Sequence, residues 1–388
     1  MGTDCVLRLQ SALVRILALV TDAYGGRGGI AKYNRDLLQA LCDPPAGNEV
    51  VALPRLVSEP IGTLPDKLTF DISGINSKLR YVISALCILA ANRRFSLIIC
   101  GHIHLLPVAF LARLFMPGAP IVLVVHGVDA WRATGNRIVD RLAERINALL
   151  AVSELTQDRF LSWAVGARAV RSFIVPNTID MTRFQPGPRR DDLVSRYQLR
   201  GKIVLMTLGR LSATEQNYKG VDVVLELMPR LLKEQPSLVY MVAGDGTDRE
   251  RLQAKAQQLG IAGQVIFTGY IPEDEKADYY RLADVYVMPS HGEGFGIVFL
   301  EAMACGVPVV GSLVDGGREA LRDGQLGILV DPARPEEVRA GILTALGQPK
   351  GRPPVGLEYF SYEKFSSRVH QAVDALLFAT SRKSSPAR

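Results

Sequence analysis

Short runs in which nearly every residue is apolar alternate along the chain with longer segments of helical spacing. Such runs are typical of parallel strands that helices cover on both faces. In the first half of the chain they predict strands at Arg15 to Val20, Glu49 to Leu53, Leu97 to Cys100, Ile121 to Val125 and Leu149 to Val152. In the second half they predict strands at Ile203 to Thr207, Leu238 to Ala243, Val265 to Thr268, Val285 to Met288, Val307 to Gly311 and Ile328 to Val330. This alternation predicts an α/β protein.

The segment Arg183 to Asp192 lies between the two series of strands and has the proline, glycine and charge content of a linker. Two α/β halves that are joined once predict two Rossmann-like domains facing a cleft. We place the N-terminal domain at residues 1–182, the C-terminal domain at 183–365 and a terminal segment at 366–388. An amphipathic helix at Ser361 to Phe378 leads into this segment, and its polar tail, Ser381 to Arg388, is expected to be disordered.

The chain contains no apolar run of the roughly 18 residues that a membrane-spanning helix needs. Its longest run, Tyr81 to Ala91, lies next to Arg80 and predicts a buried or interfacial helix. The N-terminus lacks the pattern of a secretory signal peptide, because Arg15 interrupts its apolar residues. Five cysteines at irregular spacings, without a CxxC pair, indicate reduced thiols, so we expect a cytoplasmic protein.

The 388 residues are 48% hydrophobic and 22% charged, which suits a soluble globular protein, and their net charge of +6 is uneven. The part up to Asp180 has 19 Lys and Arg against 14 Asp and Glu, whereas the remainder has 26 against 25. No nucleic-acid motif or aromatic-interleaved basic run accompanies this excess, so we expect no nucleic-acid partner. An anionic membrane surface or a diphosphate-bearing acceptor fits better, and scattered solvated arginines remain the alternative.

The stretch from Pro289 to Val310 follows a strand and contains a glycine-rich loop, a short helix and a further strand. From Ile297 to Ala304 the only polar side chain is Glu301, which predicts a buried helix whose carboxylate needs a partner. If Glu293 lay on the same helix, the two carboxylates would be about 12 Å apart and could not hold one small group. We therefore place Glu293 in the loop and Glu301 on the helix, both facing a ligand at the carboxyl end of the strand.

A second candidate ligand site lies near the N-terminus. Glycines at 25, 26, 28 and 29 follow the first strand and precede a helical pattern at Ile30 to Cys42. Backbone N–H groups and a helix N-terminus in this arrangement receive phosphate. The spacing is not GxGxxG, so a nicotinamide cofactor loses its main support. His102 and His104 lack a third ligand in the sequence, so we predict no metal site there.

The pattern Glu-x7-Glu within HGEGFGIVFLEAMACGVPVV closely resembles the signature of retaining glycosyltransferases of glycosyltransferase family 4, which have the GT-B fold. The resemblance spans nearly the whole chain and is most specific between Leu205 and Gly311. It implies that the first domain lies on the acceptor side and that the second binds a nucleotide sugar. It also implies that the C-terminal helix crosses back onto the first domain.

The resemblance further implies roles for single residues. Glu293 holds the donor sugar, Glu301 holds the ribose hydroxyls, and His126 hydrogen-bonds the sugar from the end of a strand. Arg210 and Lys219 stabilise the departing diphosphate, and the interval between them is longer than in the commonest members. The catalytic residues are therefore expected to be His126, Arg210, Lys219 and Glu293. The residues expected to bind the nucleotide sugar are Gly28, Gly29, Gly209, Tyr270, Ile271, Phe295, Gly296, Ile297 and Glu301.

Together these features predict a retaining hexosyltransferase that uses GDP-mannose or a UDP-hexose. The acceptor is expected to be a hydroxyl of a lipid-linked saccharide or glycan intermediate, reached from the inner membrane face. No Asp-x-Asp motif is present, so we expect no metal and no other cofactor. No carboxylate is placed as a covalent nucleophile, which favours front-face attack with the departing phosphate taking the acceptor's proton. A GT-B sugar-nucleotide epimerase and a non-catalytic nucleotide-sugar binding protein remain the alternatives.

Overall fold

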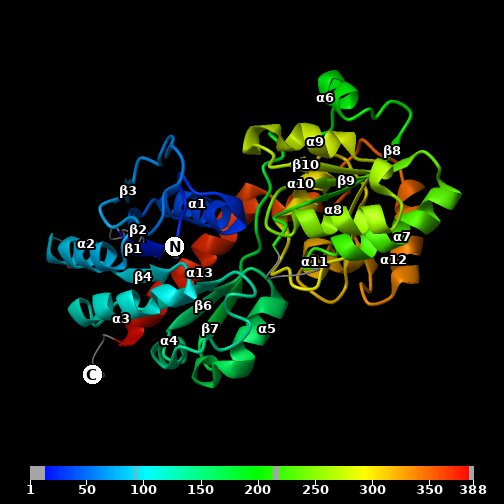
Figure 1. Ribbon diagram of the computed structural model, residues 1–388. Coiled ribbons are helices and arrows are strands. Elements are labelled where there is room, and N and C mark those ends of the chain that lie inside the picture. The colour runs from blue at the N-terminus through cyan, green and yellow to red at the C-terminus, as the bar shows by residue number, and fades with distance from the viewer. Residues whose placement is uncertain (1–13, 92–93, 213–217, 384–388) are drawn as a thin grey trace, which may run out of the picture.

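The structure is a computed structural model that describes residues 14–91, 94–212 and 218–383, with only the backbone for 378–383. It has two lobes, each built on a parallel sheet (Figure 1). The strands of the first sheet run in the order β3-β2-β1-β4-β5-β6-β7. Their bounds are β1 Arg15–Val20, β2 Glu49–Pro54, β3 Leu68–Phe70, β4 Leu97–Cys100, β5 Ile121–Val125, β6 Ala148–Ala151 and β7 Arg171–Ile174.

The second sheet runs in the order β10-β9-β8-β11-β12-β13 and is also parallel. Its bounds are β8 Ile203–Leu208, β9 Leu238–Ala243, β10 Val265–Gly269, β11 Val285–Met288, β12 Val309–Ser312 and β13 Ile328–Val330. The two orders are those of doubly wound sheets, so the predicted GT-B architecture of two Rossmann-like domains is confirmed.

Helices cover both faces of each sheet. In the first lobe they are α1 Gly28–Cys42, α2 Lys78–Ala91, α3 Leu106–Phe115, α4 Arg137–Ala143 and α5 Glu154–Trp163. The later ones are α6 Asp191–Arg196, α7 Val221–Glu234, α8 Arg249–Gln258, α9 Lys276–Leu282, α10 Ile297–Ala304, α11 Gly317–Ala320, α12 Pro335–Leu346 and α13 Tyr362–Lys383.

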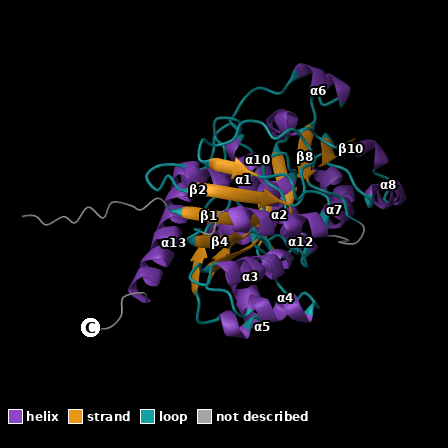
Figure 2. Ribbon diagram, turned by 90° about the vertical axis from the view of Figure 1, so that its left-hand side faces the viewer, coloured by secondary structure: helices purple, strands orange, loops and turns teal. Residues whose placement is uncertain are grey.

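The apolar run of β1 supplies side chains to both faces of the first sheet. Ile16 and Ala18 belong to the core under α1 and α13, whereas Leu17 and Leu19 belong to the core under α2 and α3. All four are fully buried. Figure 2 shows β1, β2 and β4 side by side between these helices. The near-continuous apolar pattern thus reflects a strand buried on both faces.

The C-terminal helix α13, red in Figure 1, lies along α1 of the first lobe, as predicted. Tyr362 donates a hydrogen bond to Asp43 Oδ2 at 2.6 Å, and the ring of His370 donates to the carbonyl of Ala40 at 2.6 Å. The chain therefore crosses twice between the lobes. The helix includes residues 381–383 of the tail that we predicted to be disordered, and 384–388 lie outside the described residues.

None of the described helices combines the length and the apolar character needed to cross a bilayer.

The predicted boundaries of most strands are within one or two residues of the observed ones. Two edge strands, β3 and β7, were not predicted. The α1 helix begins at Gly28 instead of Ile30. The β12 strand begins at Val309, two residues after the predicted start at Val307.

Candidate active site

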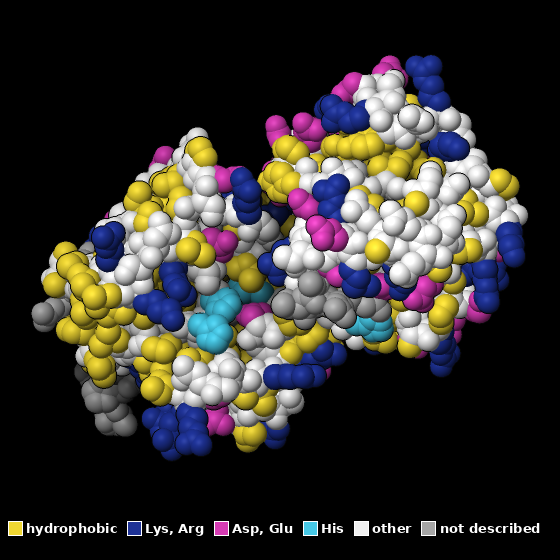
Figure 3. All heavy atoms as spheres, in the orientation of Figure 1, with side chains coloured by type: hydrophobic (Ala, Val, Ile, Leu, Met, Phe, Trp, Pro, Cys, Tyr) yellow, Lys and Arg dark blue, Asp and Glu magenta, His cyan; other side chains and the backbone are white. Residues whose placement is uncertain are grey.

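A cleft with a volume of ≈ 740 Å³ lies between the two lobes and is visible as the groove in Figure 3. Its walls come from loops that follow β1, β5, β8, β9, β10 and β11. These loops all leave the carboxyl ends of parallel strands, which is where open α/β sheets bind their ligands. Most of the predicted site residues line this cleft, namely Gly28, Gly29, His126, Gly209, Arg210, Lys219, Tyr270, Ile271, Glu293, Phe295, Gly296 and Ile297.

Two helices point their N-termini into the cleft from opposite lobes. The α1 helix begins at Gly28, with φ +85°, and α10 is preceded by Gly296, with φ +89°. Left-handed backbone of this kind is accessible to glycine without steric cost. The described first turns of α1 and α10 contain no acidic residue. Free N–H groups and the positive ends of two helix dipoles therefore favour an anion between them.

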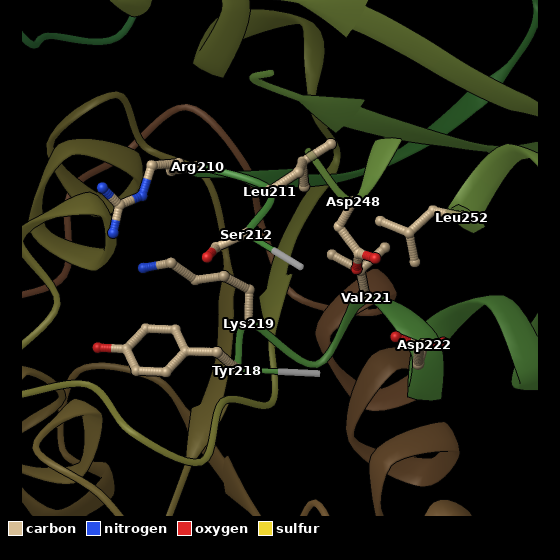
Figure 4. A pocket seen from close by; sticks show the side chains of 9 residues that line it. All are labelled: Arg210, Leu211, Ser212, Tyr218, Lys219, Val221, Asp222, Asp248 and Leu252. Carbon is tan, nitrogen blue, oxygen red and sulfur yellow. The ribbon is translucent and has the colours of Figure 1, made fainter. Parts of the chain in front are cut away.

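Arg210 and Lys219 add two cations to the same region. Figure 4 shows their charged ends extending in one direction together with the hydroxyl of Tyr218, and away from Asp222. Lys219 lies beside Gly209, where an added Cβ would come within 3.0 Å of its side chain. The segment 213–217, which separates the two cations in sequence, lies outside the described residues.

Glu293 lies in the loop before α10, as predicted, and its side chain forms an ion pair with Lys219. The residue is only 8% exposed, so this pair is largely shielded from water. Its backbone N–H donates to Asp315 Oδ2 at 2.9 Å, and its carbonyl accepts from the N–H of Gly316 at 2.8 Å. A carboxylate, a lysine and a loop held by hydrogen bonds thus meet in the wall of the cleft.

Glu301 lies on α10, as predicted, but it is not among the described residues that line the cleft. It is 2% exposed, and its Oε2 accepts a hydrogen bond from the Tyr280 hydroxyl at 2.8 Å. The partner that a lone buried carboxylate requires is therefore a tyrosine of α9. Burial, with the adjoining Glu301 charge, raises the pKa of Tyr280 well above its ordinary value, so Tyr280 remains a donor.

His126 ends β5 and lies on the wall of the first lobe. Its Nε2 donates to the carbonyl of Gly101 at 3.0 Å, and its ring meets Tyr33 edge to face at 5.1 Å. Burial lowers the pKa of His126 to about 4, so the imidazole is neutral near pH 7. Because Nε2 carries the single proton of the neutral ring, Nδ1 can only accept a hydrogen bond, and the ring brings no positive charge to the cleft.

Tyr270 and Ile271 follow β10 on the wall of the second lobe. Ile271 is buried and Tyr270 is half-exposed. The guanidinium of Arg27, from the first lobe, lies 5.2 Å from the centre of the Tyr270 ring. This cation–π contact joins the two lobes at the rim of the cleft.

The sequence did not single out Asp129 as a site residue, although it lies only three positions after His126. Asp129 lines the cleft, and its Oδ2 has no hydrogen-bond partner among the described residues. Burial raises its pKa to about 7. The imidazole Nε2 of His102 is 3.8 Å away. Its place in the strand-end loop that already carries His126 is the signal that could have pointed to Asp129.

The histidines on the first lobe, cyan in Figure 3, lie near the groove. The rings of His102 and His104 have centroids 5.3 Å apart. Within the described ranges, no group of three or more His, Cys, Asp and Glu side chains is arranged to hold a metal ion. The chemistry that the cleft supports is anion binding by Arg210, Lys219 and the backbone N–H groups at the starts of α1 and α10.

Two protein families match this chain. The family described as "Glycosyltransferase Family 4" matches residues 27–183, and "Glycosyl transferases group 1" matches residues 194–354. The matched ranges correspond closely to the two lobes. Solved structures share the fold of this chain. HepE of Anabaena, in complex with UDP and glucose, has a TM-score of 0.73 and 20% identity, covering 93% of this chain and 100% of that one. Sucrose-phosphate synthase of Thermosynechococcus elongatus has a TM-score of 0.72 and 21% identity, covering 94% and 100%.

Curated proteins show higher identity over shorter ranges. A GDP-mannose-dependent alpha-(1-6)-phosphatidylinositol monomannoside mannosyltransferase of Mycolicibacterium smegmatis is 32% identical over 248 residues, 61% of this chain and 63% of that protein. A D-inositol 3-phosphate glycosyltransferase of Geodermatophilus obscurus is 38% identical over 192 residues, 47% of this chain and 42% of that protein. The matched regions therefore span between 42% and 63% of these two relatives.

Proposed function

Because this chain belongs to the GT-B glycosyltransferases of family 4 type, we propose that it is a retaining hexosyltransferase acting on a nucleotide sugar. Its donor is GDP-mannose or a UDP-hexose, and its acceptor is a hydroxyl of a lipid-linked saccharide or glycan intermediate. The relative from Mycolicibacterium smegmatis, which is GDP-mannose-dependent, supports GDP-mannose as the first donor to test.

One observation carries this proposal. Arg210, Lys219 and the N-termini of α1 and α10 surround the same part of the cleft as the carboxylate of Glu293. Four sources of positive potential suit a diphosphate, and a carboxylate beside them suits the hydroxyls of a sugar. A nucleotide-sugar donor presents these two groups next to each other. The geometry therefore fits the donor as a whole.

Transfer of the sugar leaves a nucleoside diphosphate, on which negative charge develops as the glycosidic bond breaks. Arg210, Lys219 and the helix N-termini are already oriented toward this position, so they stabilise the charge without reorganising. Glu293 holds the sugar hydroxyls and His126 contacts the sugar from the opposite wall. The acceptor attacks from the same face as the leaving phosphate, which takes the acceptor's proton.

The first experiment is a thermal-stability screen against a panel of nucleotide sugars and bare nucleotides. A ligand that binds only the folded protein raises its melting temperature, by an amount that grows with the logarithm of the ligand concentration divided by Kd. We expect GDP or UDP with its hexose to give the largest shift. The absence of a shift with every member of the panel would contradict a nucleotide-sugar site.

Removal of divalent metal is expected to leave activity intact. Arg210 and Lys219 supply the charge that Mg²⁺ supplies in metal-dependent glycosyltransferases. Initial rates measured in excess EDTA should equal those measured with added Mg²⁺ or Mn²⁺. A strict requirement for either ion would show that the diphosphate site has been misassigned.

We further propose that the first lobe docks on an anionic membrane surface, as a cytoplasmic protein at the inner face. The outward face of α2 carries Leu79 and Ile83, which are 70% and 50% exposed and lie four residues apart. Lys78 and Arg80 adjoin this apolar stripe and are exposed. The left end of the first lobe in Figure 3, where α2 lies, shows the corresponding group of apolar side chains. The combination matches an interfacial helix on acidic lipid.

Liposome co-sedimentation tests the membrane proposal. We expect weak, salt-sensitive binding to anionic vesicles, because each cation near the surface contributes about 1 kcal/mol and is screened by salt. Ile83→Glu should abolish this binding. Val355→Glu is the matched control, because Val355 is 96% exposed in the second lobe. Equal, negligible binding to neutral and anionic vesicles at low salt would refute the membrane proposal and leave the transferase assignment unaffected.

A further inference from the structure

The loop from Asp315 to Gly317 fixes the backbone of Glu293 through hydrogen bonds. Asp315 is 2% exposed, and its two carboxylate oxygens accept from the N–H groups of Glu293 and Gly317, each at 2.9 Å. Gly316 returns a hydrogen bond to the Glu293 carbonyl at 2.8 Å. A Cβ at Gly316 would lie 2.1 Å from the carbonyl oxygen of Gly294, so only glycine fits this approach.

The same loop leads directly into α11, whose Glu319 contacts the other lobe. The carboxylate of Glu319 accepts the N–H of Glu154 at 2.6 Å and the N–H of Leu155 at 2.9 Å. Both N–H groups belong to the first turn of α5, where they have no partner within the helix. A carboxylate at this end of the helix is also favoured by the helix dipole.

The residue that follows Glu293 is held by the first lobe as well. Ser153 Oγ, which precedes α5, donates to the carbonyl of Gly294 at 2.6 Å. A Cβ at Gly294 would lie 2.0 Å from the carbonyl oxygen of His126. The start of α5 therefore contacts the second lobe at two points, Gly294 and Glu319.

We propose that Asp315 is a positioning residue for Glu293 and that Glu319 couples closure of the two lobes to that positioning. When the first lobe closes, the α5 N-terminus binds Glu319 and Ser153 binds Gly294, which together fix the loop that presents Glu293. When the lobes separate, both contacts are lost, and Asp315 and the N–H of Gly316 hold the loop from within the second lobe. This inference deepens the proposed function and rests on it, because Glu293 is the donor-sugar ligand.

The alternative is that these contacts only hold the two lobes together and leave Glu293 unaffected. Glu319→Gln separates the two views, because glutamine keeps the size of the side chain but presents an amide to one of the two N–H groups. Glu336→Gln is the matched control, since Glu336 is an exposed carboxylate of the same lobe that pairs with Arg230 and Arg339. Asp315→Asn tests the positioning residue itself.

The experiment compares three quantities in the full chain: Kd for bare GDP or UDP by calorimetry, kcat for hexose transfer, and the radius of gyration by X-ray scattering with and without nucleotide. For Glu319→Gln we expect an unchanged Kd, kcat reduced at least 10-fold, and a larger radius of gyration that nucleotide no longer reduces. For Asp315→Asn we expect an unchanged radius and a similar loss of kcat. Glu336→Gln should match the wild type in all three.

A kcat for Glu319→Gln within twofold of the wild type would overturn the coupling, as would a loss of kcat accompanied by an equal loss of nucleotide affinity. If Asp315→Asn does not fold, Glu319→Gln alone decides the coupling, because its side chain lies at the lobe interface and not in the core. If the wild-type chain transfers no hexose, the proposed function fails. Scattering then still decides whether Glu319 closes the lobes, and an unchanged radius in Glu319→Gln overturns that claim.

Discussion

Lys219→Ala is expected to lower kcat for hexose transfer about 100- to 1,000-fold, which is the loss seen when one pre-oriented donor to a developing anion is removed. Lys219 lines the cleft and forms an ion pair with Glu293, and both side chains are shielded from water. Removal of the lysine thus eliminates a cation at the diphosphate and also leaves the Glu293 carboxylate without this partner. Steady-state kinetics with saturating donor give the value.

Two further variants control for that result. Lys219→Arg keeps the charge and is expected to recover part of the activity, although a guanidinium has a different shape. Lys233→Ala removes an exposed lysine from the last turn of α7, within the same lobe, and is expected to have no effect. A kcat for Lys219→Ala within a few fold of the wild type would exclude Lys219 from the reaction.

Glu301 and Glu293 are expected to affect different quantities, Glu301 the affinity for the nucleotide and Glu293 the turnover rate. Glu301→Gln should weaken binding of bare GDP or UDP about 10- to 100-fold, because a charge-assisted hydrogen bond to ribose contributes roughly 1.5–3 kcal/mol. Glu293→Gln should leave the affinity for the bare nucleotide nearly unchanged and should lower kcat by a similar factor, because its contacts are made with the sugar. Calorimetry and steady-state kinetics on both variants measure the two effects.

Glutamine is chosen at 301 because Glu301 is buried and accepts a hydrogen bond from Tyr280, which the amide oxygen of glutamine can still accept. The fold should therefore survive, and an unchanged melting temperature without ligand checks this. Tyr280→Phe is the companion variant, since it removes the partner without touching the carboxylate. Unchanged nucleotide affinity in Glu301→Gln would remove the assignment of this residue to the ribose.

The central strands could be predicted from the sequence because each is apolar on both faces. The edge strands could not. β7 consists of Arg171 to Ile174, whose side chains are exposed or partly buried, so it lacks the continuous apolar run. β3 has three residues, of which only Leu68 is buried. An edge strand pairs with only one neighbour and buries few side chains, so its sequence shows only a weak hydrophobic pattern. Its position in the sheet depends on pairing with a strand that is distant in sequence.

The same limit applies to the site. Glu293, Glu301, Arg210 and Lys219 could be proposed as site residues because their motifs are local. The loop position of Glu293 and the helix position of Glu301 agree with the structure. Asp315 and Glu319 were not identified, because their partners lie 22 and about 165 residues away in the chain. The roles proposed for them rest on hydrogen bonds to backbone N–H groups, which nearly every residue type carries, so the sequence of the partner gives no signal.

The most direct test of the central claim is an NMR time course of the full chain with GDP-mannose or a UDP-hexose and a polyprenyl- or inositol-linked acceptor. A retaining hexosyltransferase produces a new glycosidic bond in which the anomeric carbon keeps the configuration that it has in the donor, together with one equivalent of nucleoside diphosphate. A product of inverted configuration would contradict the retaining mechanism. Tight binding of the nucleotide sugar without any new glycosidic bond, across the panel of donors and acceptors, would contradict the transferase assignment and favour a nucleotide-sugar binding protein.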